Sequence, residues 1–399
     1  GGDAFETWIR QMIPLPLPQD LLPQIYAWQI SVFRARGQWD KIGELAPDCI
    51  RKFDAGVYRQ LLGDPVLAEL SAGRYDQAGK ILDALEKNAG SNQTLKDLIA
   101  IERTDILFQR GDWPGAEQRF VAVAGGLSDG ELAGWVPRVI GGCIRQKQLD
   151  LADRLCDVVL KGPKEKIAAK DQAAAPWIEV AKARQDTAAI PVRLETLRGL
   201  GVSPQVLLDV YYGEFYPVLG EDKKDIVLAM VAFGERLEPL LPKDNDKAQV
   251  RALALDGVFI TQDYARALKI LDLGIPGRDK NWHEMAVNKA QAHLALQSGK
   301  PKEAVEHFRK FMTRFAVQWD RPEKDPITGV MYSKEMCLGR NAKRIGDILT
   351  DAGDSKAAAD AYAEARGYYT KALANEGADS KEAEVIKIEM AEIGKPPKK

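Results

Sequence analysis

The sequence contains few of the residues and motifs from which catalytic sites are built. Only three of its 399 residues are histidine, at His283, His293 and His307. The segment NWHEMAV, residues 281–287, begins like a zinc-protease helix but lacks the second histidine four positions after the first. There is no Gly-rich phosphate loop after a strand, no GxSxG turn and no cysteine paired with a nearby histidine. We therefore predict that the chain is not an enzyme and needs no cofactor or metal ion.

Cysteine is scarce and widely spaced. Cys49, Cys143, Cys156 and Cys337 form no CxxC or other metal-ligand spacing, so we expect them to be small buried residues. Cys143 and Cys156 are near enough in sequence to face each other across adjacent helices. A disulfide between these two in an oxidising compartment stays an open alternative.

An excess of one charge and long apolar runs are also missing. The chain carries 56 basic and 58 acidic side chains, for a net charge of -2. This balance excludes a general nucleic-acid binder, because such proteins need a basic surface to displace counterions from phosphates. No run of about eighteen apolar residues occurs, so we expect no membrane-spanning helix.

The N-terminus bears on where the protein works. The chain begins Gly1-Gly2-Asp3 without methionine, which we interpret as a natural N-terminus trimmed for expression. Residues 13–23, IPLPLPQDLLP, predict an extended lead-in, because proline fixes φ and restricts the residue before it. These features favour an exported protein, so we predict an extracytoplasmic location, periplasmic or envelope-associated. Four unpaired cysteines would fit the cytoplasm, which is the alternative.

The sequence is rich in one repeated feature, a corner between two helices. At residues 298–311, SGKPKEAVEHFRKF has the pattern of one helix end, a short corner and the start of a second helix. Seven clear copies align on an anchor residue, at Gly37, Gly73, Gly111, Lys147, Gln262, Gly299 and Gly353. Degenerate copies at Gln185 and Gly220 fill the one long gap. A hairpin that recurs at a nearly fixed interval predicts a stacked repeat array.

Each corner repeats the same kinds of residue at the same positions. Glycine or a polar residue at the anchor suits the left-handed conformation that ends a helix. Five residues later a small residue lets the second helix cross its partner closely, and nine residues later a large residue follows in most copies. The small residues are Ala78, Ala116, Ala152, Ala267, Ala304 and Ala358. The copy at Gly37 departs from the pattern, because Ile42 takes the small position.

This set of positions resembles the tetratricopeptide repeat, whose units carry a Gly-x-Tyr-x-x-Ala-x-x-x-Phe core. The resemblance covers residues 24 to 375, in units slightly longer than the roughly 34 residues of the family. It implies an all-α, right-handed α-solenoid of about nine antiparallel helix-turn-helix repeats. The predicted divisions are a proline-rich lead-in (1–23), N-terminal repeats (24–184), degenerate repeats (185–247), C-terminal repeats (248–378) with an insertion at 316–336, and a capping helix with the tail (379–399).

The last division has its own apolar pattern. Ala383, Ile386, Met390 and Ile393 are three or four residues apart and form one stripe on a helix. We predict that this helix packs on the pair that ends near Ala374 and caps the array.

The resemblance implies that the first helix of each pair lines a concave face where partners dock. Counting back from the last two anchors places a basic set on this face, which is a candidate site for an acidic segment or a chain-terminal carboxylate. The set is Lys289, His293, Arg340, Lys343 and Arg344. Ordinary solvated helix charges are the alternative reading. The insertion adds Trp319 and Tyr332 as candidate residues of a binding loop, and the alternative is that Trp319 folds back over the neighbouring helix and caps its core.

These features together predict a non-catalytic scaffold or adaptor that binds a protein or peptide partner. Two alternatives stay open. One is a self-associating structural subunit of a cell-envelope assembly, and the other is a cryptic hydrolase of glycan or peptide whose site is built from scattered carboxylates.

Overall fold

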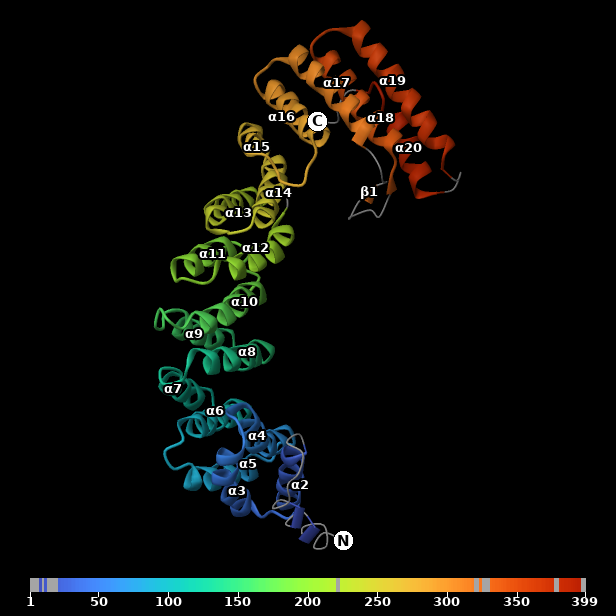
Figure 1. Cartoon of the computed structure of the whole chain (residues 1–399). Helices are drawn as coiled ribbons and strands as arrows, with labels where there is room; N and C mark the ends of the chain where they lie inside the picture. Colours follow the sequence, from blue (N-terminus) through green and yellow to red (C-terminus); the bar gives the residue numbers. More distant parts are fainter. Residues whose placement is uncertain are drawn as a thin grey trace. The chain divides into compact units, whose positions relative to one another are not determined.

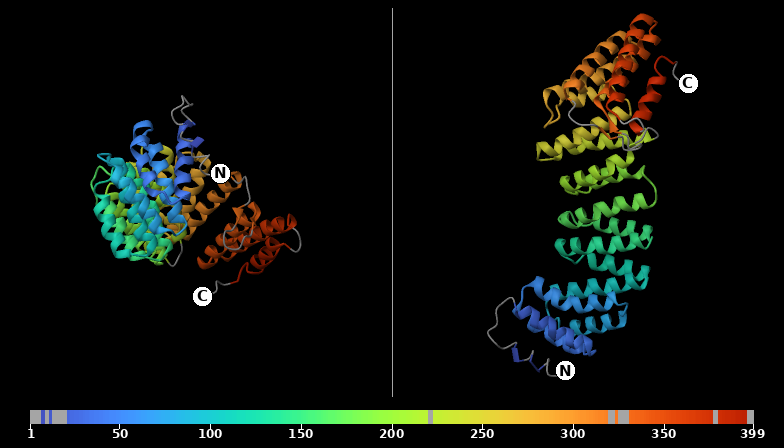
Figure 2. Two further views of the ribbon diagram at one scale, coloured as in Figure 1. Left: turned by 90° about the horizontal axis from the view of Figure 1, so that it is seen from below. Right: turned by 90° about the vertical axis from the view of Figure 1, so that its right-hand side faces the viewer.

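The computed structural model describes residues 7–8, 11–12, 21–219, 223–318, 323–324, 331–376 and 380–395. These residues are almost all helical (Figure 1). The chain divides into two compact units, Gly1–Leu207 and Leu208–Lys399, and the boundary falls inside helix α12. Within each unit, successive helices stack in layers, as the side view in Figure 2 shows.

Unit 1 is built from helix pairs joined by short corners. We call the helix before each corner the first helix and the one after it the second helix. The pairs are α2 (Leu22–Ala35) with α3 (Trp39–Lys52), α4 (Ala55–Ser71) with α5 (Tyr75–Asn88), α6 (Gln93–Arg110) with α7 (Trp113–Ala124), α8 (Asp129–Arg145) with α9 (Leu149–Leu160), and α10 (Ile167–Ala183) with α11 (Ala189–Gly199).

Unit 2 continues the same plan and ends on a single helix. Its pairs are α12 (Pro204–Val218) with α13 (Lys224–Leu237), α14 (Asp244–Ile260) with α15 (Tyr264–Asp272), α16 (Lys280–Gln297) with α17 (Pro301–Gln318), and α18 (Lys334–Asp351) with α19 (Ser355–Ala374), followed by α20 (Lys381–Ala391). A short 3-10 helix, η2 (Glu238–Leu240), follows α13. The described residues therefore form nine helix pairs and a last helix, as predicted.

The corners share one backbone geometry. Eight of the nine predicted anchors have a left-handed φ between 58° and 78°. At each of them the anchor N–H donates to the carbonyl three residues earlier, and the next N–H donates to the carbonyl five residues before itself. This pair of bonds is the Schellman motif, which ends a helix and satisfies its last carbonyl groups. The ninth anchor, Gly220, lies outside the described residues.

The small positions lie where the sequence pattern placed them. The five alanines from Ala78 to Ala304 are fully buried, and Ala358 is almost so. Ile42, which departs from the pattern, is fully buried as well. The next residue, Gly43, lets α3 approach α5 of the following pair closely, because a Cβ there would lie 2.3 Å from the carbonyl oxygen of Ala84 on α5.

The degenerate copies differ in how well the pattern describes them. The copy at Gln185 keeps the left-handed anchor and buries Ile190 at the small position. The copy at Gly220 is shifted, because the pattern would place Asp225 in the core and Asp225 is exposed. Helix α13 buries Val227 and Val231 instead, two residues later.

The predicted cap and insertion are both visible. Helix α20 buries Ile386 against the core of the α16 to α19 pairs, Ile393 beyond its end is buried there too, and Ala383 is fully buried. This confirms the capping helix. Within the insertion, β1 (Glu323–Lys324) and β2 (Met331–Tyr332) pair antiparallel, with Glu323 opposite Tyr332. The segment is therefore not helical throughout, as its breakers predicted.

Candidate functional site

The described residues contain no cluster that marks a metal or thiol site. No group of three or more His, Cys, Asp or Glu side chains among them could hold a metal ion. All four cysteines are free thiols in the structure, and burial raises the pKa of Cys49 and Cys143 to about 12. A thiol with so high a pKa is a weak nucleophile at neutral pH. No helix in the described part of the chain has the length and apolar character needed to cross a membrane.

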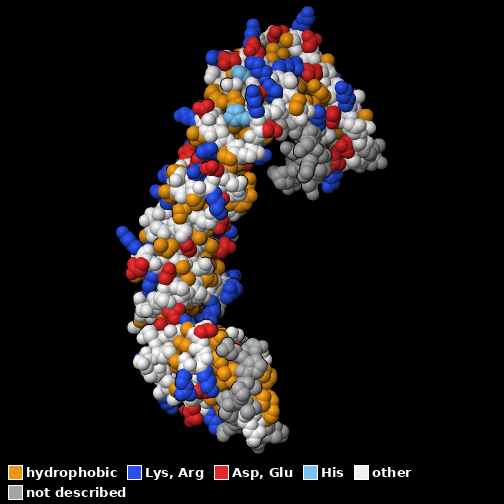
Figure 3. All heavy atoms as spheres, in the orientation of Figure 1, with side chains coloured by type: hydrophobic (Ala, Val, Ile, Leu, Met, Phe, Trp, Pro, Cys, Tyr) orange, Lys and Arg blue, Asp and Glu red, His pale blue; other side chains and the backbone are white. Residues whose placement is uncertain are grey.

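The basic set predicted from the sequence divides into separate groups. Lys289 and His293 lie on α16, and the remaining three members lie on α18. The Arg344 guanidinium reaches α16, where its Nη2 lies 3.2 Å from Nδ1 of His293. The structure thus brings two consecutive first helices side by side, as the repeat pattern predicted. Figure 3 shows Lys and Arg side chains gathered beside the His side chains in this part of unit 2.

The side chain of His293 is buried between aromatic rings. Its ring stacks on Tyr264 with centroids 4.5 Å apart and meets the Phe308 ring edge-on at 5.4 Å. Burial, followed by the charges of Arg344 and Lys289, lowers the pKa of His293 to about 3. The ring is therefore neutral at neutral pH, so Nδ1 accepts the hydrogen bond from Arg344.

Arg344 is the exposed cation of the set that faces rings rather than a carboxylate. Its guanidinium lies 5.1 Å from the Phe308 ring centroid, and no ion pair joins it to a described carboxylate. Lys289 lies 4.9 Å from the Phe259 ring centroid on α14. Aromatic faces stabilise both cations.

The other predicted site residues have partners of their own. Arg340 forms an ion pair with Glu389 on α20, in which Nε donates at 2.8 Å, and it lies 4.1 Å from the Tyr332 ring centroid. Lys343 lies 3.0 Å from the Asp347 carboxylate on the same helix. Tyr332 is partly buried and packs on the core of unit 2. Trp319 lies outside the described residues.

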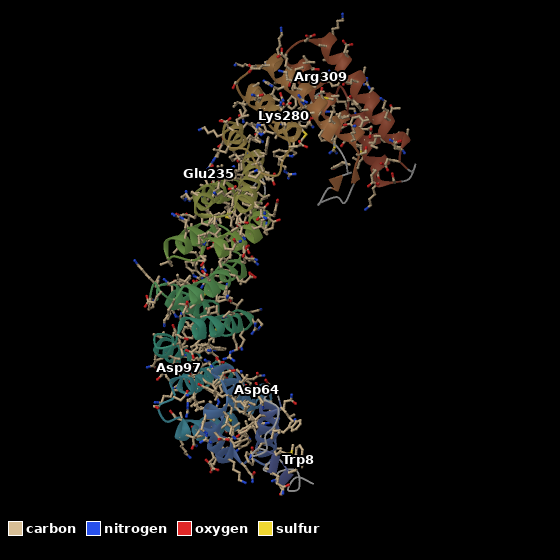
Figure 4. The ribbon with its side chains drawn as sticks, in the orientation of Figure 1. Trp8, Asp64, Asp97, Glu235, Lys280 and Arg309 are labelled. Atoms are coloured by element: carbon tan, nitrogen blue, oxygen red, sulfur yellow. The ribbon has the colours of Figure 1, made fainter. Side chains whose placement is uncertain are left out.

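Sequence reasoning missed a second and wider site, on the first-helix face of unit 1. A hollow of about 1020 Å³ is lined by three consecutive first helices, α4, α6 and α8, and by the turn before α8. Asp97, labelled in Figure 4, lines it from α6. On α8 the lining residues Gly130, Gly134 and Arg138 are four apart, so one helix face carries them all. We call this hollow the unit 1 groove.

The unit 1 groove contains a buried acidic pair. Glu102, which lines the groove, is 3% exposed, and Asp105, which contacts the lining residues Trp135 and Arg138, is 6% exposed. Arg138 Nη2 lies 2.5 Å from Asp105 and 3.2 Å from Glu102, and the indole N–H of Trp135 donates to Asp105 at 2.9 Å. Across the groove Arg59 pairs with Glu131 at 2.5 Å. The signal that could have found this site was the four-residue spacing of two glycines and an arginine on a first helix.

A smaller hollow of about 440 Å³ lies between α13, α14 and α15 in unit 2. Its arginines are already paired, Arg266 with Glu235 at 2.6 Å and Arg251 with Glu238 at 2.6 Å. Because these guanidinium groups already donate to carboxylates of the protein, the two arginines do not favour any particular class of ligand for this hollow.

Stacked helix pairs with Schellman corners and buried small residues define a tetratricopeptide-like helical repeat protein. No protein-family model matches the sequence, and no curated protein sequence does so either. Similar solved structures include a circular tandem repeat protein with a novel repeat topology, at 11% identity over 98% of this chain and 96% of that chain, with a TM-score of 0.25. The APC/C hetero-tetramer Cut9-Hcn1 shows 11% identity over 92% of this chain and 84% of that chain, with a TM-score of 0.23.

A third similar structure is a signal transduction ATPase with a tetratricopeptide repeat sensor, from Pyrococcus horikoshii. It shows 11% identity over 94% of this chain and 56% of that chain, with a TM-score of 0.25. Such low TM-scores carry no argument about function, so the assignment above rests on the helix pairs themselves.

Proposed function

We propose that the chain is a non-catalytic scaffold that binds protein or peptide partners along its first-helix faces. The observation that carries this proposal is the unit 1 groove, whose walls come from three consecutive first helices. A peptide bound along the groove would contact all three helices in turn. Charged side chains lie along its wall, among them Arg59, Asp97 and Arg138. Gly130 and Gly134 leave room on its α8 wall, because a Cβ at either would meet no atom within 4 Å.

The test uses the whole chain and a displayed library of random peptides. Peptides enriched on the parent are measured against Gly134→Trp, which fills the groove from an exposed glycine. The matched control is Val121→Trp, which places the same ring on the second helix α7, where Val121 is 48% exposed. Binding that is lost with Gly134→Trp and kept with Val121→Trp supports the proposal. Peptides that bind both variants equally, or a library that yields none, would overturn it for this groove.

The cationic patch of unit 2, Lys289 with Arg344, supports a finer proposal for an acidic partner. The Arg344 guanidinium is exposed and can donate to a carboxylate without breaking an existing ion pair. Arg340 and Lys343, which the sequence placed in the same patch, are engaged with Glu389 and Asp347. The binding determinant on α18 is therefore Arg344.

This finer proposal is tested with a labelled peptide that ends in consecutive glutamates. Arg344→Glu should weaken its binding by about tenfold or more, and salt should weaken binding to the parent. The control is Lys356→Glu, which reverses one charge at an exposed position of the second helix α19. Equal affinities for the two variants would remove the patch from the binding surface.

A further inference from the structure

The unit 1 groove has an unmatched acceptor. Glu102 is buried and lines the groove, and its Oε2 has no hydrogen-bond partner among the described residues. Its Oε1 accepts only from Arg138, at 3.2 Å. A buried carboxylate oxygen without a donor is costly, and a donor brought by a ligand would remove that cost.

The surrounding charges explain why the protein itself does not supply this donor. Arg138 lies closer to Asp105 than to Glu102, at 2.5 Å against 3.2 Å. Arg59, the other guanidinium of the groove, is held by Glu131 across from it. Two guanidinium groups thus serve the carboxylates Glu102, Asp105 and Glu131, and Asp97 adds a further negative charge at the wall. The groove is therefore acidic overall.

We propose that the unit 1 groove binds a basic peptide segment, and that Glu102 receives the lysine or arginine side chain of that segment as a salt-bridge partner. The inference rests on the proposed scaffold function and names the class of partner for this groove. A lysine ammonium or arginine guanidinium brings the N–H donor that Oε2 lacks and the positive charge that the groove lacks. The glycine-lined wall of α8 leaves room for the peptide backbone beside it.

The protonation of Glu102 fits this role. Burial raises the pKa of Glu102 to about 7, and Arg138 and Arg59 offset part of that rise while Asp105 adds to it. Near neutral pH the Glu102 carboxyl is therefore partly protonated, and a bound cation displaces that proton. Binding of a basic peptide should accordingly release protons and strengthen as pH rises from 6 to 8.

The experiment measures a fluorescein-labelled Gly-Ser peptide that contains lysine, and its counterpart with glutamate in place of lysine. Glu102→Gln keeps the shape of the protonated side chain and removes its ability to ionise. We expect the parent to prefer the lysine peptide, and Glu102→Gln to bind it about tenfold more weakly, with the pH dependence lost. Glu44→Gln is the control, since it removes the same charge from an exposed position on α3, outside the groove.

Gly134→Trp provides a second variant that leaves Glu102 unchanged. It should also weaken binding of the lysine peptide, because the added ring fills the groove. Equal binding of this peptide to parent and Glu102→Gln would overturn the inference, and so would a preference for the glutamate peptide or no binding at all. None of these results bears on the scaffold proposal, which the peptide library tests separately. Loss of helical content in Glu102→Gln would be detected by circular dichroism, and Gly134→Trp would then decide the matter.

Discussion

At the scale of single residues, the corners depend on a backbone conformation more than on a side chain. Five of the eight described anchors are glycine, but Lys147, Gln185 and Gln262 adopt the same left-handed φ, between 58° and 63°. For a residue with a Cβ this conformation costs roughly 1 to 2 kcal/mol. The copies at these three anchors were found from the repeat interval, because residue type alone would not have indicated them.

Replacing Gln262 with glycine should therefore stabilise the protein. Removal of the Cβ relieves the left-handed strain, and the flexibility gained by the unfolded chain offsets part of the gain, so we expect about 0.5 to 1 kcal/mol in favour of the folded state. Thr261→Gly, one residue earlier at an ordinary φ of -79°, should destabilise instead. Urea unfolding midpoints measure both, and a lower midpoint for Gln262→Gly would contradict the strain argument.

Glu102 gives a prediction about stability and pH. Its pKa is raised from 4.5 to about 7 in the folded state, so between these values the folded protein binds the extra proton. The preferential protonation of Glu102 in the folded state stabilises the protein. This stabilisation is present in full below about pH 4.5 and is lost as the pH rises through about 7. The loss is on the order of 3 kcal/mol.

Glu102→Gln cannot undergo this titration, because its amide stays neutral. Its stability relative to the parent should therefore increase from pH 4.5 to 7 and then level off above about pH 7. Asp105, Arg138 and Arg59 face Glu102 in both proteins, so the difference between them reports the titration of Glu102 together with its effect on Asp105. A difference that stays constant across this window would show that Glu102 has an ordinary pKa.

At the scale of elements, the contacts that hold the capping helix include an apolar stripe and the ion pair between Arg340 and Glu389. The stripe was predictable, because its three- and four-residue spacing is local in sequence. The ion pair between Arg340 and Glu389 was not, since 49 residues separate the partners. That pairing is why a residue predicted for the binding face serves the cap, and why its removal would loosen α20.

Two isoleucines on α20 offer a matched test of the cap. Ile386 is fully buried, whereas Ile388 is 55% exposed on the same helix. Ile386→Ala should lower the free energy of unfolding by about 2 to 5 kcal/mol, because it removes buried methyl groups and leaves a cavity. Ile388→Ala should change it by no more than about 0.5 kcal/mol. Equal effects of the two substitutions, measured by thermal unfolding, would show that α20 does not cap the array.

The degenerate pair shows where element-level prediction failed. The corner before α13 was assigned from a weak match at Gly220, and the helix instead buries residues two positions later. A two-residue shift turns a helix by about 200°, so the pattern placed Asp225 in the core although it is exposed. The interval between anchors itself varies by two residues. It therefore could not fix the position of a copy whose own residues do not match the repeat pattern.

At the scale of each whole unit, the repeat interval predicted the helix pairs and their order well. It could not predict which part of a first-helix face is open to a partner, because that depends on pairing between helices. Arg340 and Lys343 form ion pairs within the protein, whereas Glu102 in the unit 1 groove keeps an oxygen without a donor among the described residues. Pairwise charge contacts of this kind arise only once the helices are stacked.

Hydrogen exchange on the whole chain, with and without a library-selected peptide, tests the central claim most directly. The claim is that first-helix faces form the binding surface. If it is correct, the bound peptide will slow exchange in the first helices α4, α6 and α8 and leave the second helices α5, α7 and α9 unchanged. Protection confined to the second helices, or spread equally over both sets, would contradict it.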